Sequence, residues 1–349
     1  MPAHPPLAAD DTRYRFTLLR AGTFKLEGGS MFGLIPRSVW SRSVAADDKG
    51  RITVAHNCLL LDRVDDGPGP RRVLLEAGSG DKLDAKMQDI FALEKNTAGP
   101  NAGRPRAIHD CLADIGIAPE SIDAVVVSHL HFDHAGGLTR LAHPGQTPDW
   151  PCPPNDDGGG GSSQSGGCVL TFPNARVHVQ TREWSDALAN RSVMTKTYYP
   201  DHLHPVARRL VLTDSPRPFP TGYSPGRDEL PATGVDLRMT PIAPDLFVFL
   251  VPGHTWGQQA ALFREPDAPG KTGRTIVFCP DVMPTAAHLG AAYSLAYDVE
   301  PYTSMISRTW LLHEAAERGW ILHLDHEPAA PLYRVLRKAR WFDLVPEPA

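Results

Sequence analysis

The chain lacks several features that mark other classes of protein. It has only five cysteines in 349 residues and no CxxC pair, which argues against a disulfide framework and against a cysteine-built zinc site. No run approaches about 18 consecutive apolar residues, and the start has no basic segment followed by an apolar one, so neither a membrane span nor an export signal is predicted. The formal net charge of −5 gives no electrostatic footprint for nucleic acid or anionic lipid. We therefore expect a cytoplasmic protein with no nucleic acid and no membrane as partner.

The size and composition favour one large domain. With 42% hydrophobic residues the chain can bury a full core. Residues 1–11 are rich in Pro and Ala without periodicity and are predicted to be a disordered tail, so that 12–349 form a single domain. Within it, the low-complexity stretch 143–167 is predicted to be a flexible insertion. Cys152 and Cys168 bracket the Gly- and Ser-rich part of this stretch, and a disulfide between them would close the loop in an oxidising compartment, although the odd cysteine count argues for reduced thiols.

Alternating and periodic patterns predict the main elements. Strands are expected where apolar residues alternate or run together, and helices where they recur every three or four positions. The predicted strands are 14–19, 51–61, 72–76, 124–128, 246–251, 275–279 and 320–324. The predicted helices are 81–95 and 106–115, the second ending at Gly116.

The densest cluster of potential metal ligands is the hexapeptide His129–His134, which directly follows a predicted strand. In extended chain, residues i and i+2 project to the same side, so His129 and His131 can bind one ion while the following turn brings Asp133 and His134 toward a second ion. Neutral imidazole combined with carboxylate suits zinc and its neighbours. The hexapeptide therefore predicts half of a two-metal hydrolytic centre.

Further potential ligands stand at the ends of other predicted strands. His254 follows the strand 246–251, Asp281 follows 275–279, and His326 follows 320–324. Buried strands that expose polar residues at their carboxyl ends are what a sheet-based active site needs, because the strands fix the geometry.

On these motifs the chain resembles the metallo-β-lactamase-fold hydrolases. The resemblance rests on the His-x-His-x-Asp-His motif at 129–134, on Gly253–Gln258 where the family commonly has a Gly-His-Thr-Pro-Gly-type loop, on Asp281 and on the late His326. It implies an α/β fold of the α+β type, a four-layer αββα sandwich with metals held by loops at one edge of the sheets. It also implies the ligand sets: His129, His131 and His254 for the first metal, Asp133, His134 and His326 for the second, and Asp281 as a bridging carboxylate.

A closer subgroup is indicated by the segment Gly28–Trp40. A similar Gly-Gly-x-Met-Phe-Gly-x-x-Pro-x-x-x-Trp segment occurs near the start of quorum-quenching lactonases and of the related methyl parathion hydrolases. Its exposed-looking apolar residues make it a candidate homodimer contact. Other matches to this branch include Glu183-Trp184 and a segment ending at His288, and the resemblance makes Trp184 and His288 candidates to line the pocket or to support a ligand.

Two departures from the family pattern stand near the site. Some acyl-homoserine lactonases carry a Tyr three residues after the bridging Asp, where it can polarise the lactone carbonyl, but this chain has Pro284 there. The sequence therefore argues against that type of lactonase. Trp256 stands where the family commonly has a proline, which changes the stiffness of the loop without removing a ligand.

The expected mechanism follows from charge. Two divalent ions, two carboxylates and a metal-bridging hydroxide leave about +1 at the centre, which matches the negative charge that develops on a carbonyl or phosphoryl oxygen. Two ions can lower the pKa of a bridging water toward neutrality and orient it for attack. Asp133 is the candidate catalytic residue that orients this nucleophile and passes its proton to the leaving alkoxide.

The sequence thus predicts a di-metal hydrolase, with zinc as the expected ion, that cleaves an ester bond in a small-molecule substrate. The favoured substrate is a lactone such as an N-acyl homoserine lactone. Hydrolysis of an organophosphate triester or an aryl ester is the alternative, and it is favoured if the pocket is broad and aromatic. A catalytically inactive ligand-binding member of the fold is the alternative from a different class, and the complete ligand set argues against it.

Overall fold

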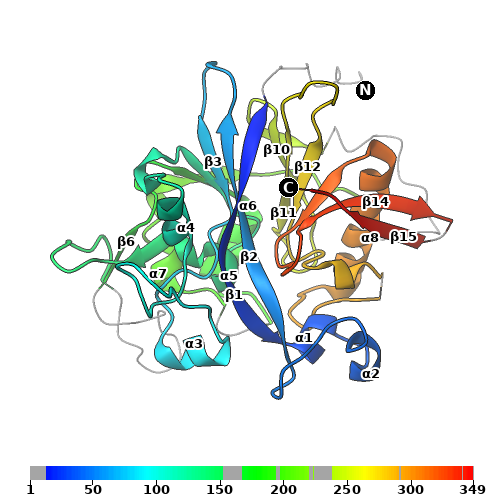
Figure 1. Ribbon diagram of the computed structural model, residues 1–349, viewed down its shortest axis with the longest axis horizontal. Helices are drawn as coiled ribbons and strands as arrows, with labels where there is room; N and C mark the ends of the chain where they lie inside the picture. The colour runs from blue at the N-terminus through cyan, green and yellow to red at the C-terminus, as the bar shows by residue number, and fades with distance from the viewer. Residues whose placement is uncertain are drawn as a thin grey trace.

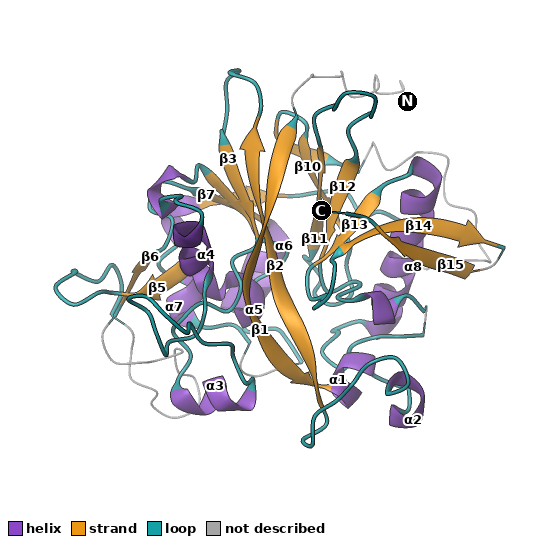
Figure 2. Ribbon diagram, in the orientation of Figure 1, coloured by secondary structure: helices purple, strands orange, loops and turns teal. Residues whose placement is uncertain are grey.

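Two β-sheets lie face to face at the centre of the molecule (Figures 1 and 2). The computed structural model describes residues 13–151, 167–193, 197–219, 223, 238–290, 292–339 and 341–348. Within these, the first sheet has the strand order β1 (Tyr14–Glu27), β2 (Arg51–Arg63), β3 (Arg72–Leu75), β4 (Ala124–Val126), β7 (Arg176–Gln180) and β8 (Leu210–Thr213). The second has the order β15 (Trp341–Pro346), β14 (Leu332–Lys338), β13 (Ile321–Leu324), β12 (Thr275–Cys279), β11 (Gln259–Arg264), β10 (Leu246–Leu250) and β9 (Thr240–Ala243). A small sheet pairs β5 (Thr139–Leu141) with β6 (Cys168–Leu170).

Alternation along the strands creates the layers. On β2, Leu59 and Leu61 point into a cluster between the two sheets, where they meet residues of the second sheet such as Phe263, whereas Leu60 points to the outer face. Successive side chains of a strand project to opposite faces, so each buried strand supplies both an inner and an outer core. The near-continuous apolar runs of the sequence reflect this burial on both faces.

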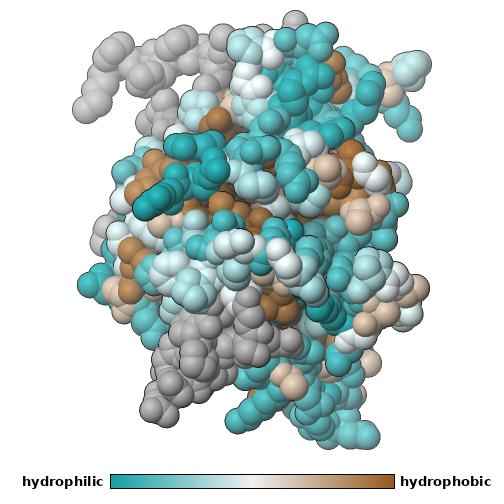
Figure 3. Space-filling model, turned by 90° about the vertical axis from the view of Figure 1, so that its left-hand side faces the viewer, coloured by the Kyte–Doolittle hydropathy of each residue, from teal (hydrophilic) through white to brown (hydrophobic). Residues whose placement is uncertain are grey.

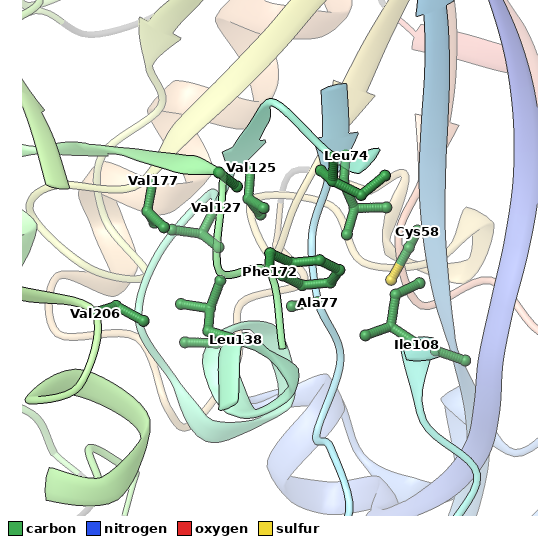
Figure 4. Packing of buried hydrophobic residues seen from close by; sticks show 14 of the residues in the cluster. Cys58, Leu74, Ala77, Ile108, Val125, Val127, Leu138, Phe172, Val177 and Val206 are labelled. Carbon is green, nitrogen blue, oxygen red and sulfur yellow. The ribbon is translucent and has the colours of Figure 1, made fainter. Parts of the chain in front are cut away.

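Helices cover the two outer faces. Ile108 and Leu112 of α4 (Ile108–Asp114) and Ala187 of α6 (Thr181–Leu188) pack on the first sheet, in the cluster that Figure 4 shows around Phe172. On the other side, Trp310 of α8 (Pro301–Arg318) packs on the second sheet. The order helix, sheet, sheet, helix confirms the four-layer αββα sandwich that the resemblance implied.

Each of the seven predicted strands is present, with β1 continuing to Glu27, but β5 to β9, β11, β14 and β15 were not predicted, and one predicted helix is much shorter. The pattern at 81–95 predicts a long helix, whereas the structure has only α3 (Ala85–Ile90) there. Asp84 accepts a hydrogen bond from the Met87 backbone N–H and so caps the helix three residues after the predicted start. The chain leaves the helix near Ala92, whose φ of 43° is left-handed.

The segment Gly28–Trp40 forms two short helices, α1 (Gly28–Phe32) and α2 (Arg37–Trp40). The expectation that the apolar residues of this segment are exposed is wrong for Met31, Phe32 and Trp40. These residues are at most 3% exposed and pack in a cluster with β1 and β2. Leu34 is exposed, at 90%, because the chain turns outward between the two helices. The homodimer contact stays a prediction.

The surface on the side of β5, β6 and α7 (Pro200–Leu203) is mostly hydrophilic, with hydrophobic side chains in small groups (Figure 3).

Three predictions fall on residues outside the described ranges. Residues 1–11 hold the predicted tail, and residues 152–166 hold most of the predicted insertion and Cys152, so the predicted disulfide with Cys168 is not tested. None of the helices in the described ranges has the length and apolar character needed to cross a bilayer.

Candidate metal centre

The loops that carry the predicted ligands meet at one edge of the two sheets. β12 and β13 run parallel, and β10 is antiparallel to β11, which is antiparallel to β12, so β10, β12 and β13 end at the same edge of the second sheet. These ends carry His254, Asp281 and His326, as the strand pattern predicted. The loop after β4 in the facing sheet adds the hexapeptide, of which Phe132–Ala135 forms α5. All the predicted ligands are buried, with at most 8% of any of them exposed.

The predicted ligands fall into the two sets that the resemblance implied. Ligand atoms of His129, His131 and His254 lie within 4.8 Å of one another, and so do those of Asp133, His134 and His326.

Asp281 lies between the two sets. Its Oδ2 is 3.1 Å from Nε2 of His254, and its Oδ1 is 3.2 Å from Nε2 of His326. The structure therefore brings together every residue that the sequence proposed as a ligand, with Asp281 in the position of a bridge.

Several buried polar atoms at the centre of this cluster have no hydrogen-bond partner among the described residues. They are Nε2 of His129, His134 and His326, and Oδ1 of Asp281. A buried polar atom left unpaired costs about 1–3 kcal/mol, so native structures rarely gather several at one point without a ligand. Imidazole nitrogens and carboxylate oxygens facing one space are the donors that zinc and related divalent ions prefer. The residues present therefore fit the metal ions implied by the sequence.

Four of the five ligand imidazoles, those of His129, His134, His254 and His326, are held in place through their other side. The anchoring contacts are His129 Nδ1 to Ser128 Oγ at 3.0 Å, His134 Nδ1 to Asp325 Oδ2 at 3.0 Å, His254 Nδ1 to Asp298 Oδ1 at 2.9 Å and His326 Nδ1 to Ala55 O at 2.8 Å. Such contacts fix the orientation of the ring and point its free nitrogen at the site. Asp325, beside His326 in the sequence, thus orients the neighbouring ligand His134.

Charge and burial set the protonation of the metal-free centre. Burial lowers the pKa of His129 and His131 well below the usual histidine value, which keeps both rings neutral and able to bind a metal. For His326, burial lowers the pKa, but the carboxylates of Asp281 and Asp325 outweigh it and raise the pKa to about 9. Metal binding to the second set must therefore displace a proton at neutral pH.

A buried carboxylate that was not predicted as a site residue ties the two ligand loops together. Oε1 of Glu183, on α6, accepts hydrogen bonds from the Leu130 backbone N–H at 2.9 Å and from the Tyr198 hydroxyl at 3.2 Å, and Oε2 accepts from the Thr255 hydroxyl at 2.5 Å. Leu130 lies between His129 and His131, and Thr255 follows His254. The Glu183-Trp184 motif is a match to the family branch and so drew attention to Glu183. Spacing in the sequence, however, does not show which loops a distant carboxylate will reach.

Trp184 and His288, the candidates to line the pocket or to support a ligand, are not among the residues that line the cavity at the centre. Trp184 packs against the hydrophobic cluster beneath α6. His288 donates from Nε2 to the Met31 carbonyl at 2.8 Å, its Nδ1 lies 2.8 Å from the Thr285 hydroxyl, and its ring stacks on Phe32. Both of its ring nitrogens are engaged by protein groups, so His288 supports α1.

The loop that carries His254 is held by unusually close packing. Gly253 has φ 135°, and a Cβ there would lie 2.2 Å from the backbone N of Ser304 on α8, so only glycine fits. Trp256, which departs from the family pattern, donates from Nε1 to Glu300 at 2.8 Å, and the Arg182 guanidinium lies 4.9 Å from its ring centroid. Side-chain contacts thus hold the loop at the position where the family commonly has proline.

A small cavity of about 40 Å³ opens onto the cluster. Besides ligand residues it is lined by Leu26, Met31, Phe91, Phe132, Thr197 and Tyr297. A larger cavity of about 530 Å³, lined by Phe32 and Tyr293 among others, lies elsewhere. The space next to the ligands is therefore narrow and mostly apolar.

Known proteins share this architecture. A model of the metallo-beta-lactamase superfamily matches residues 55–255. Comparison with curated proteins gives no match. A probable metal-dependent hydrolase from Staphylococcus aureus is 21% identical with a TM-score of 0.70, over 96% of this chain and 98% of that one.

Two further solved structures are similar over nearly the full length. AidC, a dizinc quorum-quenching lactonase in complex with a product, N-hexanoyl-L-homoserine, is 16% identical with a TM-score of 0.63, over 97% of this chain and 99% of that one. The hydrolase AbOPH of the beta-lactamase superfamily is 18% identical with a TM-score of 0.61, over 98% and 97%. At these identities the structural likeness supports the fold, and the family model identifies the family.

Proposed function

Because this chain belongs to the metallo-beta-lactamase superfamily, we propose that it is a two-metal hydrolase that opens the ester bond of a lactone, of the N-acyl homoserine lactone kind. The observation that carries the proposal is the convergence of the buried ligands, with Asp281 between two sets of nitrogen and oxygen donors. A binding protein without catalysis would have no need for two complete sets.

Each set has a defined task in this proposal. His129, His131 and His254 would hold one divalent ion, Asp133, His134 and His326 would hold the other, and Asp281 would contact both. When bound, the ions supply Lewis acidity and lower the pKa of a water molecule. Zinc is the proposed ion because imidazole dominates both sets.

Asp133 is the proposed catalytic residue among the ligands. It lies on the cavity wall, with Oδ2 3.6 Å from Nε2 of His326 and Oδ1 3.8 Å from Nε2 of His134. From there its carboxylate can orient a water molecule beside the substrate, accept the proton that the water loses, and deliver it to the leaving alkoxide. The products of a lactone would be a single hydroxy acid.

The lining of the cavity supports a lactone with an acyl chain as the substrate. Leu26, Met31 and Phe91 give the cavity an apolar wall that suits an acyl chain and excludes water. The likeness to a dizinc quorum-quenching lactonase points the same way, and Pro284 sets this chain apart from lactonases with a Tyr at that position.

The experiment is a substrate panel on the zinc-loaded protein. We expect about two zinc ions per chain by elemental analysis and turnover of acyl lactones in preference to aryl esters and phosphotriesters. Preference for phosphotriesters would replace the lactone with the alternative substrate class. Tight binding of lactones without turnover in the fully loaded protein would refute an enzymatic function.

A further inference from the structure

Two residues that carry hydroxyl groups, Thr197 and Tyr297, line the cavity at the metal centre besides the ligand residues. The other lining residues that are not ligands are apolar, namely Leu26, Met31, Phe91 and Phe132. Ester hydrolysis places negative charge on the carbonyl oxygen, and a fixed hydrogen-bond donor at that oxygen stabilises the transition state. The neutral donors of this cavity are therefore the groups to consider for that task.

The backbone around Tyr297 is fixed on both sides. The Ala296 N–H donates to the Ser30 carbonyl of α1 at 2.8 Å, and the Val299 N–H donates to the His254 carbonyl at 3.2 Å. Asp298 accepts from the Leu295 N–H with one carboxylate oxygen at 3.1 Å and holds His254 with the other. Tyr297 thus lies in a short loop tied to α1 and to a ligand loop, so its side chain has a defined position in the wall.

The phenol of Tyr297 keeps its proton. Burial raises its pKa to about 12, and this effect outweighs that of the hydrogen bond with the Ser30 side chain, which lowers the pKa. A phenol that stays neutral at pH 7 is a hydrogen-bond donor, and a stronger one than the alcohol of Thr197. Asp133 and Asp281 line the same cavity as Tyr297.

We propose that Tyr297 is a further catalytic residue, whose phenol donates a hydrogen bond to the substrate oxygen that becomes negative during hydrolysis. The proposal rests on the proposed ester hydrolysis and adds to it a donor that comes from the loop before α8. No bond to Tyr297 forms or breaks, since the phenol keeps its proton throughout and Asp133 carries the proton to the leaving group. Tyr297 would perform this task in a chain that has Pro284 after the bridging Asp.

The test compares Tyr297→Phe with the wild type and with Tyr293→Phe as the matched control, because Tyr293 lines the larger cavity. We expect Tyr297→Phe to lower kcat on the best lactone about 10²-fold, as loss of one oxyanion donor does in other enzymes. Zinc content and the thermal unfolding midpoint should stay at wild-type values. Calorimetry should show binding of an alkyl phosphonate, a tetrahedral mimic, weakened about tenfold or more. Tyr293→Phe should change none of these quantities.

Two further variants make the outcomes decisive. Ser30→Ala removes the bond that orients the phenol and should lower kcat by a smaller factor, about threefold to tenfold. Equal losses in Tyr297→Phe and Tyr293→Phe, or a loss in Thr197→Val with none in Tyr297→Phe, would overturn the role of Tyr297. A wild type without turnover on any ester would refute the proposed function and this role with it, whereas wild-type turnover retained by Tyr297→Phe refutes this role alone.

Discussion

Single residues beside the metal centre hold its ligands in place, and one of them has a strained backbone. Glu76, directly after β3, is buried and has φ 67°, a left-handed conformation that costs a residue other than glycine about 1–3 kcal/mol. Its Oε1 accepts a hydrogen bond from the Ser128 N–H at 2.7 Å, and its Oε2 lies 3.6 Å from Nδ1 of His134. The strained backbone thus places a second carboxylate beside Asp325 at the same imidazole, which fixes His134 from two sides.

Replacing Asp133 should separate metal binding from turnover. In Asp133→Asn the side chain keeps its size, and His134 and His326 remain, so we expect zinc content close to that of the wild type. Turnover of the best lactone should fall about 10²- to 10⁴-fold, because an amide cannot accept and pass on a proton. Asp84→Asn, which changes a carboxylate at the start of α3 where Asn also caps well, is the control and should keep full activity. Full activity of zinc-loaded Asp133→Asn would exclude the role of Asp133 in proton transfer.

Replacing Glu183 should weaken metal binding through the ligand loops. Its two oxygens accept from three donors, and the amide of Glu183→Gln would turn an N–H group toward one of them. We expect the apparent zinc affinity, measured by competition with a chelator, to fall about 10- to 100-fold, as it does when groups that orient metal ligands are lost.

Asp186→Asn provides the matched control, because Asp186 is equally buried on α6 but bonds only Arg182 and Arg191 in the contacts that the structure defines. Its zinc affinity should stay within about twofold of the wild type. An equal loss of affinity in both variants would mean that α6 acts on the centre only through general stability.

At the scale of elements, the strands that form apolar runs could be predicted from the sequence, whereas β5 to β9, β11, β14, β15, the long helix α8 and the short helices could not. A strand buried on both faces appears in the sequence as an apolar run, so β2, β10 and β12 can be recognised without knowing which strands they pair with. Helices of four to six residues, such as α1 and α3, are decided by caps and by tertiary contacts. The apolar residues of Gly28–Trp40 looked exposed because nothing in the local pattern shows that β1 and β2 cover them.

The segment after the hexapeptide is held by a buried lysine. Nζ of Lys82, just before α3, donates to the Gly136 carbonyl at 2.5 Å and to the Thr139 carbonyl at 2.6 Å. Both carbonyls belong to the segment that directly follows α5. Lys82→Met keeps the aliphatic volume but leaves both carbonyls without a donor. We expect the free energy of unfolding in urea to fall by about 2–4 kcal/mol. Lys86→Met, at an exposed position on α3, should change it by less than about 0.5 kcal/mol. Equal effects would show that the Lys82 contacts add nothing specific.

At the scale of the molecule, the ligands could be predicted because they follow strands, and their supports could not. His254, Asp281 and His326 each follow a predicted strand, and the resemblance to the metallo-β-lactamase-fold hydrolases implied that they share one centre with the hexapeptide. Glu183 and Tyr297 reach the centre from a helix and a loop, and their positions depend on how whole layers pack. Neither periodicity nor spacing in the sequence encodes such contacts, so the interactions of Glu183 and Tyr297 became visible only in the three-dimensional structure.

The balance between protons and metal should make the stability of the whole molecule depend on pH. His326 has a pKa of about 9 in the metal-free fold against about 6.5 in the unfolded chain. A raised folded pKa contributes stability below pH 6.5, and this contribution is lost as the pH rises through 9. Zinc competes with the same proton, so its apparent affinity, and the stabilisation that it gives, should rise over this range.

The gap in melting temperature between zinc-loaded and chelator-treated protein should therefore widen from pH 6.5 to pH 9. Differential scanning calorimetry at fixed free zinc across this range measures the gap directly. The loaded protein should hold or gain stability with rising pH while the metal-free protein loses it, because only the metal-free centre depends on the proton at His326. A gap that stays constant, or one that narrows toward pH 9, would mean that zinc binding does not displace that proton.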